Sequence, residues 1–204
     1  MGEMEVFVDS ANDLRARERN LNSLGTVTVT VVLAGVTMTF GALIVVFLVR
    51  ALKDEFWSHI KLPNILWLST AVLIASSVFL EKARNKMRAG DWEGFHEGMK
   101  WTMLLGILFL AGQIAAWLQI LLSGVAMTNN PHSWFIFLFS GLHGLHIVAG
   151  LAGLGYLFYR TREQASGPRY QMETRAAARA IGIFWHYMDA MWLLLFALLI
   201  FWRR

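Results

Sequence analysis

Five long apolar stretches separated by short charged segments constrain this chain more than any other feature. A helix needs about 20 mostly apolar residues to cross the roughly 30 Å hydrocarbon core of a bilayer. The core offers no water to backbone groups, so apolar segments of this length cross it as helices. The sequence therefore predicts an all-α polytopic membrane bundle with five spans, at about 25–49, 62–82, 100–123, 132–159 and 178–202.

The composition agrees with a membrane protein and excludes several other classes. Charged residues make up 16% of the chain, against about 25% in a typical soluble domain. There is no cysteine, which excludes disulfides and cysteine-held zinc or iron–sulfur sites. The net charge of +4 does not predict a nucleic-acid partner, because the basic residues lie between the apolar spans, where such residues orient membrane helices.

The basic residues also predict the orientation of the chain. Three basic clusters, within 15–19, 82–100 and 160–179, fall on one side of the membrane, and five basic residues fall on the other. Because cytoplasmic loops carry the excess of Lys and Arg, we expect a cytoplasmic N-terminus and a C-terminus outside. Residues 1–24 are expected to form a polar tail, and 25–204 a single transmembrane domain with no room for a soluble catalytic domain.

A few polar side chains fall inside the predicted spans. Such groups are costly in a bilayer and usually face the interior of the bundle. His143 and His146 are three residues apart, as are His186 and Asp189, so each pair shares one helix face. The candidate residues for interhelical polar contacts or a site are Glu81, Gln113, His143, His146, His186 and Asp189.

Those residues alone leave four interpretations open. A bis-histidine haem needs two facing histidines at similar depth, but helical rise separates His143 from His186 by roughly 12–13 Å in depth, with His146 closer. A metal site would need a third ligand that nothing in the sequence brings near. Chains of buried Asp and His also serve as proton relays. In the fourth interpretation, which we favour, the groups pair across helices and stabilise packing by about 0.6–2 kcal/mol each.

Small residues in the fourth span favour that packing interpretation. Small residues four apart let two membrane helices approach closely. The span contains such pairs, and we expect it to be crowded by neighbouring helices at Ser140, Gly141, Gly144, Gly150 and Gly153.

Three stretches resemble subunit III of the haem–copper terminal oxidases. FIFLFSGLHGLHIVAG (135–150) and FWHYMDAMWLLLFALLIFW (184–202) are similar to its two most characteristic segments, and LPNILWLSTAVLIASSVFLEKA (62–83) to the preceding helix. Five spans match the shorter bacterial form of the family. An accessory protein of nitric oxide reductases shares the WH-x-x-D and His-x-x-His patterns, but Gly144 favours the oxidase. A small membrane cytochrome b or transporter stays as an alternative from another class.

The resemblance implies a non-catalytic subunit of a cytochrome c or quinol oxidase in a bacterial inner membrane. Haems and copper would then lie in partner subunits, and this chain would hold no cofactor apart from bound phospholipids. The implied partners are subunit I above all, then subunit II, a fourth subunit and a respiratory supercomplex. Subunit III is thought to stabilise subunit I and to sustain its proton uptake. By motif, the histidines and Asp189 are expected to form hydrogen bonds between the fourth and fifth spans and with neighbouring helices.

Two family positions differ in this chain. The family often has a glutamate near the position of Gly35 and another shortly after Gln113, but residues 25–49 contain no acid and residues 114–117 are Ile, Ala, Ala and Trp. The paired loss leads to the hypothesis that the two acids normally serve one contact within the bundle.

Overall fold

Five helices account for nearly all of the chain that the structure describes, namely residues 2–53, 62–123, 131–162 and 167–201 of a computed structural model. The helices are α1 (Gly2–Lys53), α2 (Ile65–Arg88), α3 (Trp92–Leu122), α4 (Pro131–Arg162) and α5 (Pro168–Phe201). Each contains a segment long and apolar enough to cross a membrane. The predicted all-α class and the five spans are confirmed.

The helices extend beyond the apolar spans that the sequence marks. α2 continues through the charged segment after residue 82 to Arg88, and α3 begins at Trp92, ahead of the span expected from residue 100. α1 begins at Gly2, so the backbone of the expected tail continues the helix of the first span. Polarity marks where a helix leaves the hydrocarbon core, whereas the helix itself ends where its backbone finds other partners.

A tight turn joins α2 to α3 and fixes them as an antiparallel hairpin. Gly90 has a φ of +82°, and the N–H groups of Asp91 and Gly90 donate to the carbonyls of Lys86 and Met87. This is a Schellman motif, whose left-handed residue is usually glycine. The Asp91 side chain then accepts a hydrogen bond from the Gly94 N–H at 2.8 Å and caps α3. A short stretch of local sequence therefore ends one helix and starts the next.

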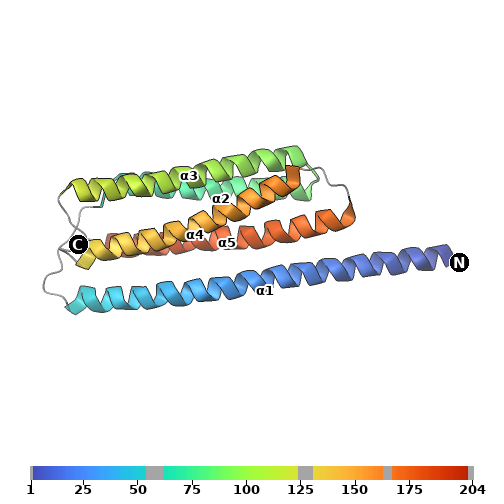
Figure 1. The fold of residues 1–204 in the computed structure, drawn as a ribbon, viewed down its shortest axis with the longest axis horizontal. Coiled ribbons are helices and arrows are strands. Elements are labelled where there is room, and N and C mark those ends of the chain that lie inside the picture. Colours follow the sequence, from blue (N-terminus) through green and yellow to red (C-terminus); the bar gives the residue numbers. More distant parts are fainter. Residues whose placement is uncertain (1, 54–61, 124–130, 163–166, 202–204) are drawn as a thin grey trace.

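The helices lie side by side along one long axis, with α5 in the centre (Figure 1). α5 contacts α1, α2 and α4, and α3 packs on α2 and α4. Among the described residues, α1 contacts α5 and α4 but neither α2 nor α3. One side of α5, between α2 and α1, is therefore left without a helix over it.

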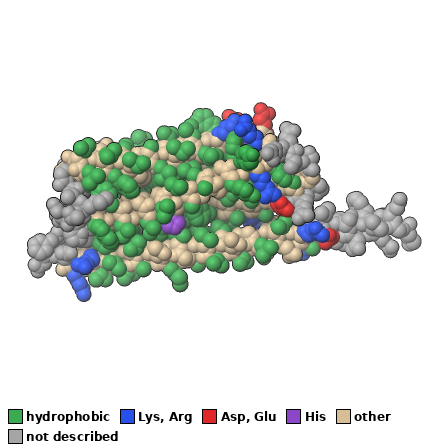
Figure 2. All heavy atoms as spheres, in the orientation of Figure 1, with side chains coloured by type: hydrophobic (Ala, Val, Ile, Leu, Met, Phe, Trp, Pro, Cys, Tyr) green, Lys and Arg blue, Asp and Glu red, His purple; other side chains and the backbone are tan. Residues whose placement is uncertain are grey.

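Side-chain polarity follows the long axis of the bundle. Hydrophobic side chains cover the length of the face shown in Figure 2, and Lys and Arg gather near the two ends. We call the end where α2 meets α3 and α4 runs toward α5 the basic end. Fully buried aromatic side chains occupy the interior, among them Phe40, Phe109, Phe139, Trp185 and Trp192. This distribution is the one expected of a bundle that spans a bilayer.

Candidate functional site

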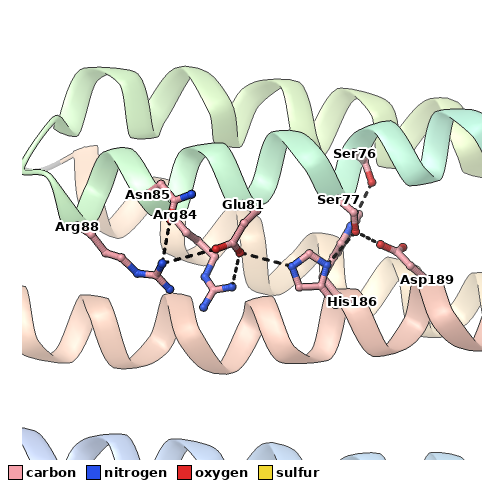
Figure 3. Close-up of polar contacts among 9 residues, drawn as sticks. Ser76, Ser77, Glu81, Arg84, Asn85, Arg88, His186 and Asp189 are labelled. Carbon is pink, nitrogen blue, oxygen red and sulfur yellow. Dashed lines mark hydrogen bonds and ion pairs between the residues drawn. The ribbon is translucent and has the colours of Figure 1, made fainter.

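The polar residues of the fifth span meet α2. Ser77 on α2 lies between His186 and Asp189 on α5, and Figure 3 shows the three side chains converging. The Ser77 hydroxyl donates to Asp189, so its oxygen accepts from the Nδ1–H of His186 at 3.0 Å. On the other side of the imidazole, Nε2 lies 3.7 Å from a carboxylate oxygen of Glu81. We call Ser77, Glu81, His186 and Asp189 the α2–α5 seam.

Two arginines connect the seam to the basic end. Arg84 donates to Glu81 at 2.7 Å, and Arg88 lies 3.6 Å from the second Glu81 oxygen (Figure 3). Gly182 on α5 leaves room for the first of these, because a Cβ there would come 3.0 Å from the Arg84 guanidinium. The row of groups thus starts at the charged end of α2 and reaches inward to Asp189. Pairing of this kind is how membrane helices tolerate ionisable side chains.

The seam is buried at its inner end and open at its outer end. Asp189 is buried, and its Oδ1 has no hydrogen-bond partner among the described residues. The side chains of Glu81 and His186, in contrast, are 40% and 39% exposed. The seam therefore joins the two helices and also presents polar atoms on the outer surface of the bundle.

Two buried tryptophans and one partly buried tryptophan add hydrogen bonds between helices. Trp185 and Trp192 on α5 donate from Nε1 to Ser76 and Thr70 on α2, at 3.1 and 3.0 Å. In the other half of the bundle, Trp117 on α3 donates to Ser140 on α4 at 2.8 Å. Each bond satisfies an indole N–H that would otherwise be unpaired in an apolar interior.

Sequence reasoning missed these indole groups. Tryptophan in a membrane protein usually marks the interface, so residues in the middle of a span drew no attention. The available signal was spacing: Trp185 and Trp192 are seven residues apart on α5, and Thr70 lies six residues before Ser76 on α2. Residues seven apart are almost two full turns apart and share a helix face, so the two tryptophans were the usable part of this signal.

Gln113 makes a similar contact between α3 and α2. Its side-chain amide donates to the Ser69 hydroxyl at 3.2 Å, and Ser69 donates in turn to the Leu66 carbonyl of its own helix. The Gln113 carbonyl oxygen is buried without a partner among the described residues. Gln113 thus joins α3 to α2, the helix that carries Ser77 and Glu81 of the seam.

The two histidines of α4 have different surroundings from each other and from His186. His143 is fully buried between the rings of Phe109 and Trp192, at centroid distances of 5.7 and 5.0 Å. Neither of its ring nitrogens has a hydrogen-bond partner in the described part of the chain. His146 donates from Nδ1 to the Leu142 carbonyl of its own helix at 2.7 Å, and its ring faces Phe40 of α1.

Of the hydrogen bonds expected for these residues, the described part of the chain shows those with a neighbouring helix but none between α4 and α5. His143 contacts α5 through the Trp192 ring, and His186 and Asp189 bond to α2. The described residues contain no group of three or more His, Asp or Glu placed to hold a metal ion. Within the chain, Gln113, His186 and Asp189 join helices through hydrogen bonds, whereas the rings of His143 and His146 pack against aromatic rings of other helices.

The small residues of α4 line contacts of ordinary van der Waals distance, with one tighter exception. A Cβ on Gly144 would lie 3.6 Å from Leu110, one on Gly141 3.5 Å from Trp117, and one on Gly153 3.5 Å from Ile181. Gly150 is closer to its neighbour, at 3.1 Å from the Trp185 ring. Ser140 contributes its hydroxyl to the bond with Trp117.

The closest helix approach lies elsewhere, between α3 and α2. A Cβ on Gly98 would come 2.6 Å from the Ala83 Cβ and 3.1 Å from its Cα, and one on Gly112 would come 2.9 Å from the Ser69 Cβ. These glycines are fourteen residues apart, as are the residues they face. A repeat built on seven residues keeps one face of each helix turned toward the other.

The two positions where the family often carries acids are not neighbours in this chain. Gly35 on α1 has no atom within 4 Å of a built Cβ, and α1 does not contact α3 in the described residues. The structure therefore does not bring together the positions that the hypothesis of one shared contact requires.

These observations define a class: a multi-pass α-helical membrane protein whose intramembrane polar groups connect its own helices. A model of the cytochrome c oxidase subunit III family matches residues 55–204, from shortly before α2 through α5. The match covers more than half of the chain, and the chain belongs to this family.

Individual relatives carry the same family name. The chain is 29% identical over 188 residues to the probable cytochrome c oxidase subunit 3 of Nocardia farcinica, covering 90% of this chain and 89% of that one. It is 27% identical over 140 residues to cytochrome c oxidase subunit 3 of Synechocystis sp., with coverage of 69% and 56%. A probable cytochrome c oxidase subunit 3 of Mycobacterium tuberculosis is 28% identical over 134 residues, with coverage of 66% and 64%. The chain thus spans less than two thirds of the length of the last two relatives.

Proposed function

We propose that this chain is the non-catalytic subunit III of a haem–copper terminal oxidase in a bacterial cytoplasmic membrane. It packs beside the catalytic subunit I, binds phospholipids, stabilises subunit I and supports its proton uptake. Subunit II and the haems and copper of the partner subunits complete the oxidase. The basic end faces the cytoplasm, in keeping with the distribution of Lys and Arg.

The observation that carries this proposal is that the three histidines contact different helices. A haem held by two histidines needs both rings to face one another, whereas His143, His146 and His186 contact α5, α1 and α2 respectively. The family match supports the oxidase, and the contacts of these side chains with three different helices of the bundle support a structural role for this subunit.

Purification of the tagged chain from its native membrane in mild detergent tests the proposal. We expect haem absorbance and a large catalytic subunit, identified by mass spectrometry, to elute with the chain and to be lost when a harsher detergent strips it free. Haem that remains on the isolated chain would contradict the proposal, and so would a nitric oxide reductase as the recovered partner.

The support of proton uptake has its own measurement. Oxygen consumption of the complete oxidase is compared with that of an oxidase lacking this chain, across a range of pH. If the chain supports proton delivery, its removal lowers the rate most at high pH, where protons are scarcest. Equal rates at every pH would remove that part of the proposal and leave the structural role in place.

A further inference from the structure

The outer edge of the α2–α5 seam exposes polar atoms at membrane depth. Glu81 lies seven residues before Arg88 on α2, and His186 seven residues after Arg179 on α5. At 1.5 Å per residue, each lies about 10 Å inward from that arginine, while Lys82 and Arg84 lie closer to Glu81 along α2. Their side chains are nevertheless 40% and 39% exposed on the surface of the isolated chain.

Lipid tails cannot satisfy these side chains. Ionisable groups at this depth almost always face protein or a water-filled cavity. Within the chain, Glu81 is paired with Arg84 and approached by Arg88, and these contacts still leave it open on one side. α1 does not cover the opening, because among the described residues it contacts only α5 and α4.

The residues beside Glu81 and His186 are of the apolar and small types that pack in contacts between membrane helices. Val78 on α2 and Leu193 on α5 are 49% and 42% exposed, and Ala190 is exposed one turn beyond His186. Apolar side chains thus border the polar pair on the side away from the basic end, and a small residue allows a helix to approach closely. We call Val78, Glu81, His186, Ala190 and Leu193 the seam face.

The outer face of α3 provides the contrast within the same molecule. Its exposed side chains at comparable depth are apolar, among them Leu104, Ile107, Leu108 and Ala111. Lipid tails satisfy a surface of that kind completely. The outer face of α3 is therefore suited to lipid, whereas the seam face is suited to protein.

We propose that the seam face is the surface on which a transmembrane helix of the partner oxidase subunit packs, with a hydrogen-bond donor of that helix placed against the Glu81 carboxylate. The inference rests on the proposed function and adds to it the face that docks. The contacts to Arg84, Arg88 and His186 leave part of this carboxylate exposed. A carboxylate can accept further hydrogen bonds, so a donor on the docking helix is its complement. The contact also covers the His186 ring.

Photo-crosslinking in the intact complex tests the assignment. A benzophenone amino acid is placed at position 190 on the seam face or at position 111 on the outer face of α3. Both positions are exposed alanines eleven residues beyond a basic residue, Arg179 and Lys100 respectively, so they lie at matched depth. We expect position 190 to crosslink to a large oxidase subunit in the purified complex and position 111 to lipid.

The outcomes separate the docking face from the proposed function. If the complex co-purifies but position 190 crosslinks only to lipid or to a second copy of this chain, the seam face is not the docking surface and the proposed function stands. If no oxidase subunit co-purifies with the unsubstituted chain, the proposed function fails and this inference fails with it.

A second pair of variants probes the same face without removing a polar contact. Ala190→Leu adds bulk to the seam face, and Ala111→Leu adds the same bulk on α3. We expect Ala190→Leu to lower the partner subunit recovered per chain roughly threefold to tenfold, the range that corresponds to helix contacts of this kind, with thermal stability of the isolated chain unchanged. Equal recovery with both variants would overturn the proposal.

Discussion

Helix α2 is held on its two sides by different kinds of contact. Toward α3, small residues bring the backbones together, with Ala83 against Gly98 and Ser69 against Gly112. Toward α5, side chains meet through hydrogen bonds, from Trp185 to Ser76 and from Ser77 to Asp189. Because lipid tails are as apolar as leucine, a membrane helix gains little from burying apolar surface alone. One helix therefore uses close backbone approach on one side and polar pairing on the other.

The largest expected effect is at the α2–α3 contact. Gly98→Ala would place a Cβ 2.6 Å from the Ala83 Cβ and 3.1 Å from its Cα, and a backbone neighbour cannot turn aside. We expect a loss of about 1–3 kcal/mol in stability, the usual range for overpacking. Unfolding in a detergent titration, followed by tryptophan fluorescence, measures it.

Gly35→Ala is the control for this substitution. The Gly35 position has no atom within 4 Å of the added Cβ, so only the intrinsic preference of alanine for the helix remains. If Gly98→Ala unfolds no more readily than Gly35→Ala, the α2–α3 contact is looser than the structure shows.

The next effect is at the hydrogen bonds between α2 and α5. Trp185→Phe removes the donor to Ser76 but keeps a ring against Gly150. We expect a loss of about 0.6–2 kcal/mol, as for other interhelical hydrogen bonds in membranes. Combining it with Ser76→Ala in a double-mutant cycle isolates the bond from the packing.

Trp134→Phe is the matched control, because Trp134 is 51% exposed and its indole N–H has no hydrogen-bond partner among the described residues. Additive losses from Trp185→Phe and Ser76→Ala would show that the bond contributes nothing, and would leave packing as the main contact on both sides of α2.

The smallest effect is expected on α4. Gly144→Ala would set a Cβ 3.6 Å from the Leu110 side chain, an ordinary contact distance. Alanine is favoured over glycine in a helix by about 1 kcal/mol, so we expect stability to be unchanged or slightly raised. Detergent titration alongside Gly98→Ala gives the comparison, and a loss as large as that of Gly98→Ala would mean that α4 is packed as tightly as α3.

The sequence predicted some contacts of the polar residues and not others. It identified Glu81, Gln113, His143, His146, His186 and Asp189 because charge and amide groups are conspicuous in an apolar span. It predicted bonds between the fourth and fifth spans and with neighbouring helices, and His186 and Asp189 bond to Ser77 on one such neighbour, α2. Helical spacing tells which residues share a face, but the identity of the helix opposite that face depends on how all five helices are arranged.

The glycines also show that the sequence does not identify which helix lies opposite a given residue. The small residues of the fourth span drew attention because they are dense there, yet the closest approach occurs at Gly98 and Gly112 on α3. A glycine on a lipid-facing surface and a glycine in a helix contact look alike in a sequence. Only the neighbour, here Ala83 or Ser69, distinguishes them.

By itself, the sequence determined that the chain forms five membrane helices and belongs with oxidase subunit III, since apolar length and short motifs are local properties. The tertiary structure decided that α5 lies at the centre, that α1 does not contact α2 or α3 in the described residues, and that the polar groups of α5 meet α2. The reason is physical: the hydrophobic effect sets which segments enter the membrane, whereas the partners of each helix inside it depend on shape and hydrogen bonding between residues far apart in sequence.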